Sequence, residues 1–82
     1  MESKITLIKR STPICPQCIN MQNVLEEEGL LFNVIDIATD TEVVEKYNLS
    51  SVPVILINDN GNEIRLNGLQ PIEVIKEFLE DW

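Results

Sequence analysis

Apolar residues follow two patterns along this chain, short continuous runs and spaced positions on one helical face. Continuous runs without helical spacing are typical of buried strands, whereas strict alternation with polar residues is typical of half-exposed strands. Strands are therefore predicted at residues 5–8, 31–37, 52–57 and 64–67. The second run is apolar on both faces apart from Asn33 and Asp36, as expected if helices cover both sides of a sheet. The fourth run alternates and is predicted to be an edge strand.

Apolar residues at three- and four-residue spacing predict three helices between and after these strands. Pro16 and Pro71 fit first helical turns, where a missing N–H costs little. Gly29 and Asn48 are expected to end the first two helices, and residues 39–41 offer capping side chains for the second. The predicted inner faces are Cys18, Met21, Val24 and Leu25, then Val43, Val44 and Tyr47, then Ile72, Ile75, Phe78, Leu79 and Trp82.

The order of these elements predicts an α/β fold, β-α-β-α-β-β-α, with a four-stranded mixed sheet. The first strand, helix and second strand fit a right-handed parallel unit. Residues 58–61 contain Asn-Gly, a strong signal for an antiparallel hairpin. The first strand must then be central, with helices on both faces. Because 82 residues leave no length for a second core, residues 1–82 are expected to form one domain.

Composition excludes several classes of function. The formal net charge is -8, from 14 acidic and 6 scattered basic residues, so nucleic acid is not an expected partner. No apolar run approaches the roughly 20 residues that a membrane helix needs, and the N-terminus does not resemble a secretory signal. We therefore expect a soluble, cytoplasmic protein. The absence of histidine excludes Cys-His and Ser-His catalysis.

Both cysteines, Cys15 and Cys18, lie where the first strand ends and the first helix begins. This is the carboxyl end of a central parallel strand, where active sites of open sheets tend to lie. At the helix N-cap, free backbone N–H groups and the helix dipole would favour a Cys15 thiolate, which predicts a pKa below that of a free cysteine. Cys18 lies one turn further in and should be more buried. Cys15 is therefore the predicted attacking thiol and Cys18 the resolving one, with Pro16 stiffening the turn between them.

Other uses of the same cysteines stay open. A metal or iron–sulfur carrier would need four ligands and hence a dimer, since one chain offers two thiolates and no histidine. A redox-inert binding domain is a third interpretation. The main prediction includes no metal and no tightly bound cofactor.

Three segments carry a resemblance to a known family. Residues 11–18, Ser-Thr-Pro-Ile-Cys-Pro-Gln-Cys, resemble the active-site segment of glutaredoxins and glutaredoxin-like redoxins. Residues 51–53 resemble the cis-proline element of the thioredoxin superfamily, and residues 67–71 resemble the glycine-containing loop before that fold's last helix. The element order matches over nearly the whole chain. The resemblance implies a thioredoxin fold of the minimal glutaredoxin type.

The resemblance also implies a function and a set of contact residues. The protein would be a monomeric dithiol–disulfide oxidoreductase that reduces protein disulfides, with a place in electron transport and redox homeostasis. The Val52–Pro53 bond would be cis and face the cysteines, and the Val52 backbone would pair with an extended substrate segment. Gly68 would allow close approach of the substrate backbone. Thr12 and Pro16 complete the predicted substrate-binding residues.

Two departures from the family pattern bear on the electron donor. Glutaredoxins that use glutathione usually have Lys or Arg where this chain has Thr12, and a polar pair where it has Leu69 and Gln70. Both differences weaken the case for glutathione as reductant, although Lys9 or Arg10 could supply the missing cation. The expected electron source is therefore thioredoxin reductase or a glutathione system. Lys9 also stands where thioredoxins place a buried aspartate.

Overall fold

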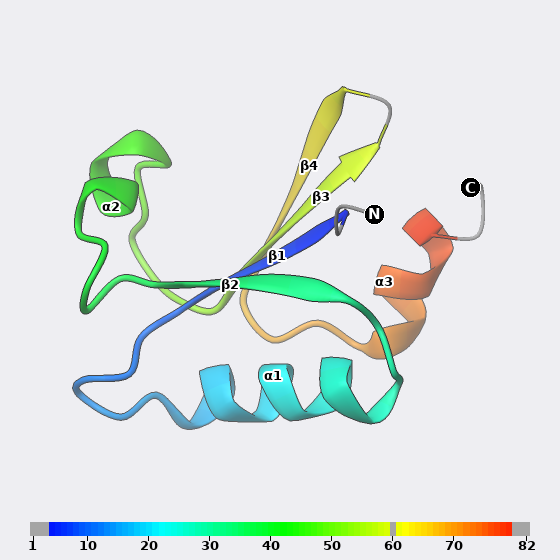
Figure 1. The fold of residues 1–82 in the computed structure, drawn as a ribbon, viewed down its shortest axis with the longest axis horizontal. Helices are drawn as coiled ribbons and strands as arrows, with labels where there is room; N and C mark the ends of the chain where they lie inside the picture. Colours follow the sequence, from blue (N-terminus) through cyan, green and yellow to red (C-terminus); the bar gives the residue numbers. More distant parts are fainter. Residues whose placement is uncertain (1–3, 60, 80–82) are drawn as a thin grey trace.

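The computed structural model describes residues 4–59 and 61–79 and has the predicted order of elements (Figure 1). They are β1 (Ile5–Lys9), α1 (Pro16–Glu27), β2 (Phe32–Asp36), α2 (Glu42–Lys46), β3 (Val54–Asp59), β4 (Asn62–Asn67) and α3 (Ile72–Leu79). Within the described residues, no helix has the length and apolar character needed to cross a membrane.

The four strands form one mixed sheet in the order β2-β1-β3-β4. β1 pairs in parallel with β2, and its last residue Lys9 lies opposite Asp36. β1 pairs antiparallel with β3, which pairs antiparallel with β4. The prediction of a central first strand, a parallel first unit and an antiparallel hairpin is therefore confirmed.

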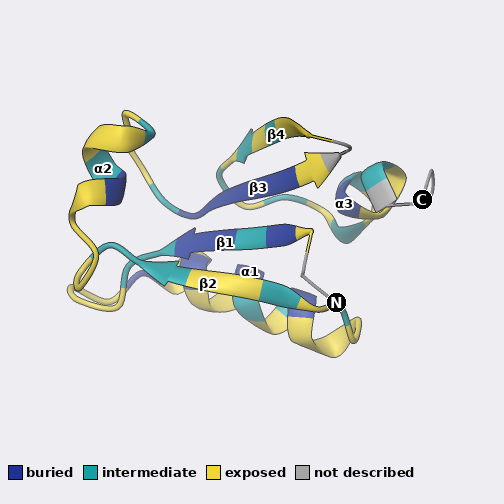
Figure 2. Cartoon of the chain, turned by 45° about the horizontal axis from the view of Figure 1, so that its top comes forward, coloured by how far each residue is buried: buried dark blue, intermediate teal, exposed yellow. Residues whose placement is uncertain are grey.

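Helices cover both faces of this sheet, as predicted (Figures 1 and 2). On one face, α1 and α3 pack on β1 and β3 around a buried cluster of Ile5, Leu7, Met21, Leu25, Ile55, Ile57 and Ile75. On the other face, the short helix α2 packs Val43 against Ile8, Val54 and Leu56. Side chains alternate along a strand, so Leu7 faces α1 while Ile8 faces α2.

Two predicted helix ends have the same capping geometry. After α1, Gly29 has φ +70°, its N–H donates to Glu26 O, and Leu30 N–H donates to Leu25 O. After α2, Asn48 has φ 50°, and the corresponding bonds run from Asn48 and Leu49 to Glu45 and Val44. Both are Schellman motifs, which need a residue that accepts positive φ, and this explains why glycine and asparagine occupy these positions.

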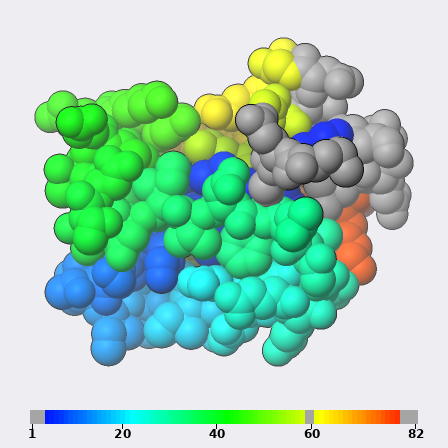
Figure 3. Space-filling model, in the orientation of Figure 1, coloured from blue at the N-terminus to red at the C-terminus, as the bar shows by residue number. Residues whose placement is uncertain are grey.

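The second strand is where the prediction fails most clearly. β2 is an edge strand rather than one covered on both faces, and it is shorter than predicted. Val34 is 43 % exposed and Leu31, just before the strand, is 75 % exposed. Figures 2 and 3 show β2 at the molecular surface. Val34 pairs with Leu7 and so lies on the sheet face of α1 and α3, but these helices pack on β1 and β3 and leave this position of the edge strand exposed.

Smaller differences concern the ends of elements. β3 begins at Val54, so Pro53 precedes the strand instead of lying in it, and β4 begins at Asn62. Thr41 occupies the N-cap of α2 but makes no side-chain capping bond, so capping by residues 39–41 was wrong. Gly61 has the positive φ expected of the hairpin, whereas Asn60 and Trp82 and the side chain of Leu79 lie outside the described residues.

Candidate active site

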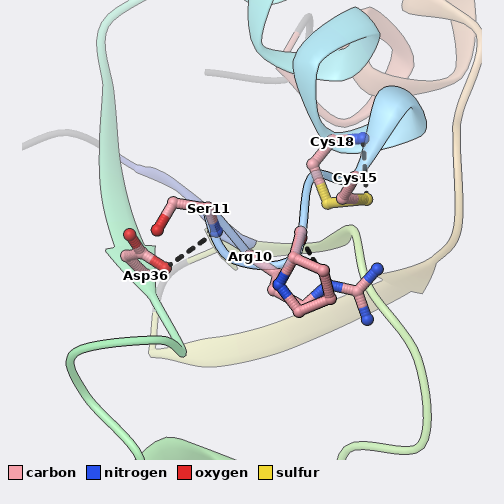
Figure 4. Close-up of a disulfide and its surroundings, with 6 residues drawn as sticks. Arg10, Ser11, Cys15, Cys18 and Asp36 are labelled. Atoms are coloured by element: carbon pink, nitrogen blue, oxygen red, sulfur yellow. Dashed lines mark hydrogen bonds between the residues drawn. A yellow bond between two sulfur atoms is a disulfide. The ribbon is translucent and has the colours of Figure 1, made fainter.

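The loop that leaves the central strand ends at Cys15, Cys18 lies in the first turn of α1, and a disulfide joins the two (Figure 4). β1 ends at Lys9 and α1 begins at Pro16, so Cys15 is the N-cap residue, with an extended backbone at φ -117° and ψ 99°. Their Cα atoms are 5.2 Å apart, within the range that a disulfide spans. The predicted placement of the pair at the carboxyl end of a central parallel strand is confirmed.

The capping interaction shows why the two sulfurs differ. The backbone N–H of Cys18 donates to the Cys15 sulfur at 3.2 Å, so Cys15 Sγ takes the place of a capping oxygen. Cys15 is also the more exposed residue of the two, at 6 % against 1 % for Cys18. After reduction, a thiolate on Cys15 would keep this N–H donor and the positive end of the α1 dipole. The geometry thus suits Cys15 for attack and Cys18 for resolution.

A hollow of about 220 Å³ opens over the disulfide and is called the disulfide hollow below. Its walls include both cysteines, two basic residues and two isoleucines, which are Lys9, Arg10, Ile14 and Ile19. Ile14 is 72 % exposed and Ile19 is 51 % exposed. Among the described residues, no carboxylate lines this hollow.

The loop between β1 and Cys15 is held at two points. Asp36 Oδ1, at the end of β2, accepts the backbone N–H of Ser11 at 3.1 Å (Figure 4). It also accepts the backbone N–H of Ala38 at 3.0 Å. Hydrogen bonding from the Ser11 side chain, and then from the Ala38 backbone, holds the pKa of Asp36 below its ordinary value. Arg10 Nε donates to Pro13 O at 3.0 Å and braces the other side of the loop.

Sequence reasoning gave Asp36 no role at the site. A signal for it was present, because parallel pairing brings the carboxyl ends of the first two strands to one edge of the sheet. The Arg10 contact had no such signal, since it depends on the path of a loop.

The predicted substrate-binding segments lie together around a cis proline. The Val52–Pro53 bond is cis, as expected. The N–H of Gly68 donates to Pro53 O at 2.8 Å, which joins the loop after β4 to this segment. A second hollow of about 120 Å³ is lined by Arg10, Ser51 and Val52 among others. Because Arg10 lines both hollows, the disulfide and the Val52 segment lie on adjoining parts of the surface.

The remaining predicted contact residues are placed less distinctively. Thr12 and Pro16 are exposed and line neither of these two hollows. The Thr12–Pro13 bond is also cis, which the sequence did not lead us to expect. Gly68 has φ +83°, and a Cβ added there would meet no atom within 4 Å. Its backbone conformation therefore accounts for glycine, while close approach of a substrate stays a prediction.

Leu69 and Gln70 form part of an apolar surface. With Val24, Pro71 and Ile72 they line a third hollow of about 360 Å³ beside α1. Leu69 is 47 % exposed, and the backbone N–H of Gln70 donates to Met21 Sδ at 3.4 Å. The position at which glutathione-using glutaredoxins have a polar pair is thus largely apolar here.

The described residues contain no group of three or more His, Cys, Asp or Glu side chains placed to hold a metal ion. The alternative of a metal or cluster bound between two copies needs a second chain and stays a prediction.

Comparisons with known proteins agree on one type of protein. A family model described as glutaredoxin matches residues 5–61. The SPbeta prophage-derived thioredoxin-like protein YosR of Bacillus subtilis (strain 168) is 36 % identical over 77 residues, covering 92 % of this chain and 95 % of that protein.

Two solved structures show the same fold. A glutaredoxin from Archaeoglobus fulgidus is 27 % identical with a TM-score of 0.68, over 94 % of this chain and 86 % of that one. The glutaredoxin-like NrdH-redoxin from Escherichia coli is 21 % identical with a TM-score of 0.65, over 88 % and 91 %. These likenesses confirm the predicted thioredoxin fold.

Proposed function

This chain belongs to the glutaredoxin family of thiol–disulfide oxidoreductases, and we propose that it reduces the disulfides of protein substrates through Cys15 and Cys18. The observation that carries the proposal is the asymmetry of the pair. Cys15 is the more exposed sulfur and accepts the Cys18 N–H at the helix N-terminus, whereas Cys18 is almost fully buried behind it.

The reaction follows from this asymmetry. In the reduced protein, the Cys15 thiolate attacks one sulfur of the substrate disulfide, a mixed disulfide forms, and the other substrate sulfur leaves as a thiolate. The Cys18 thiol loses its proton to solvent and attacks Cys15 Sγ. The Cys15–Cys18 disulfide is then restored, and the second substrate sulfur leaves. Two electrons have passed from the cysteine pair to the substrate, whose two sulfurs take up protons.

Recognition of the substrate would use backbone groups next to the disulfide. An extended substrate segment would lie along Val52, beside the cis proline and Gly68, and would gain main-chain hydrogen bonds without requiring one side chain. The adjoining positions of the disulfide hollow and the Val52 hollow support this path. Exposed Ile14 and Ile19 would contact the substrate's apolar side chains.

The surface around the site favours a protein substrate over glutathione. Thr12 supplies no cation for a glutathione carboxylate at the position where glutathione-using glutaredoxins have one, and Leu69 contributes apolar surface, although Lys9 and Arg10 line the disulfide hollow. The same features favour a protein reductase, such as thioredoxin reductase, as electron source. E. coli NrdH-redoxin, a glutaredoxin-like protein described as having a thioredoxin-like activity profile, shares the fold. We propose that this chain likewise combines a glutaredoxin-like structure with thioredoxin-like activity.

The proposal is tested by turnover of a protein disulfide in two arms, one with NADPH and thioredoxin reductase, the other with glutathione and its reductase. We expect turnover with thioredoxin reductase, little with glutathione, and loss of turnover to background in Cys15→Ser and Cys18→Ser. Lys46→Met, a substitution on α2 away from the loop, is the control and should match wild type. Undiminished turnover of Cys15→Ser would overturn the proposal.

A further inference from the structure

Lys9 is a charged residue at a partly buried position. It ends the central strand, two residues after Leu7, and strand alternation places it on the sheet face that packs against α1. It is half-buried and lines the disulfide hollow together with Cys15 and Cys18. A residue that carries an ammonium group thus lines the same small hollow as the reactive cysteines.

Among the described residues, no carboxylate forms an ion pair with Lys9. The Asp36 carboxylate lies opposite Lys9 in the register and attracts it electrostatically, but that carboxylate is hydrogen-bonded to Ser11 and Ala38. The other charged group of the hollow, Arg10, is also a cation. Within the part of the chain that the structure describes, the Lys9 ammonium takes part in no ion pair, although the chain carries 14 acidic residues against 6 basic ones.

Reduction of the disulfide creates a negatively charged thiolate in a hollow that is lined by cationic residues. An external dithiol breaks the S–S bond, becomes a disulfide itself, and leaves two electrons on the cysteine pair. Of its two protons, one stays on the pair and one goes to solvent, so the pair becomes one thiol and one thiolate. The chain has no histidine, and no described carboxylate lines the hollow to accept a proton. Cationic groups can instead make the thiolate more stable.

We propose that Lys9 is an electrostatic positioning residue that stabilises the thiolate formed in the disulfide hollow when Cys15–Cys18 is reduced. The value of this effect for catalysis rests on the proposed function, but the effect of Lys9 on the thiolate can be measured on the cysteine pair alone. Its consequence is a cysteine pair that ionises at lower pH and is reduced more readily than it would be beside a neutral side chain.

The test compares Lys9→Met, Lys9→Arg and the control Lys46→Met as reduced proteins, by rate of alkylation with iodoacetamide against pH. We expect Lys9→Met to move the alkylation midpoint upward and to lower the thiolate fraction below the midpoint by about threefold to tenfold. Lys9→Arg should restore most of the wild-type profile, and Lys46→Met should leave it unchanged. In equilibrium with a dithiol buffer, the constant for reduction of Lys9→Met should fall by a similar factor.

Two results would overturn the proposal. One is a Lys9→Met profile that coincides with those of wild type and Lys46→Met. The other is a Lys9→Arg profile as displaced as that of Lys9→Met, since that would assign Lys9 a structural role. If Lys9→Met lacks a cooperative unfolding transition, Lys9→Gln replaces it in the same measurement. These results are separate from failure of the proposed function, which would appear as turnover that survives Cys15→Ser.

Discussion

The Asp36 carboxylate accepts the backbone N–H of Ser11 at 3.1 Å, and this bond fixes the active-site loop to the end of β2. The neighbouring strand thereby holds the path of the chain from Lys9 to the N-cap Cys15. The position of the disulfide thus depends in part on Asp36, which lies 21 residues after Cys15 in the sequence.

Asp36→Ala should lower the free energy of unfolding at pH 7 and change its pH dependence. The pKa of Asp36 is lowered in the folded state, so its ionised carboxylate stabilises the folded protein. This stabilisation is fully present above the unfolded-state pKa, about 3.9, and is lost as pH falls through the lower folded-state pKa. Denaturant unfolding at pH 7 and near pH 3 should show a difference from wild type that shrinks in acid.

Asp40→Ala is the matched control for that measurement. Asp40 is an exposed acid in the same connection, and its carboxylate makes no hydrogen bond among the described residues. A difference from wild type that is as large in Asp40→Ala, or that persists unchanged in acid, would contradict the role of the Asp36–Ser11 bond.

Much of the fold could be predicted because its signals are local. The helix endings at Gly29 and Asn48 follow from the positive φ that these positions need, and the place of the cysteines follows from the change of pattern after β1. Exposure of β2 could not be predicted from its apolar sequence, because it depends on which elements cover an edge strand. Asp36 and Arg10 escaped notice because their partners are backbone groups of a loop, which have no sequence pattern.

Leu25→Ala should destabilise the protein by about 2–5 kcal/mol, because Leu25 is fully buried in the cluster beneath α1. Leu31→Ala removes the same atoms from a side chain that is 75 % exposed, and it should change stability by less than about 0.5 kcal/mol. Denaturant unfolding of the two variants checks both values. Similar losses in the two would contradict the assignment of Leu31 to the surface.

Ile19→Ser should weaken reduction of a protein disulfide more than reduction of a small one. Ile19 is half exposed on the rim of the disulfide hollow, where a protein substrate would cover it and a small disulfide would not. We expect kcat/KM to fall roughly tenfold for the protein substrate, from lost burial of one aliphatic side chain. Leu31→Ser is the matched control at an exposed site away from the hollow. Equal losses for both substrates would count against docking at this rim.

Gly68→Ala should cost about 1–2 kcal/mol of stability, since Gly68 has φ +83° and donates its N–H to Pro53 O. A clash is not expected, because the added methyl group would point into open space. Unfolding by denaturant measures the loss. An unchanged midpoint would show that this loop accepts a side chain without strain.

The most direct test of the assigned roles is to trap the covalent intermediate with a protein disulfide and identify the linked cysteine by peptide mass spectrometry. Cys18→Ser should accumulate a mixed disulfide through Cys15, because attack occurs and resolution cannot. Cys15→Ser should accumulate little or none, because Cys18 is only 1 % exposed. A stable adduct through Cys18 in Cys15→Ser, formed as fast as the Cys15 adduct, would contradict the account.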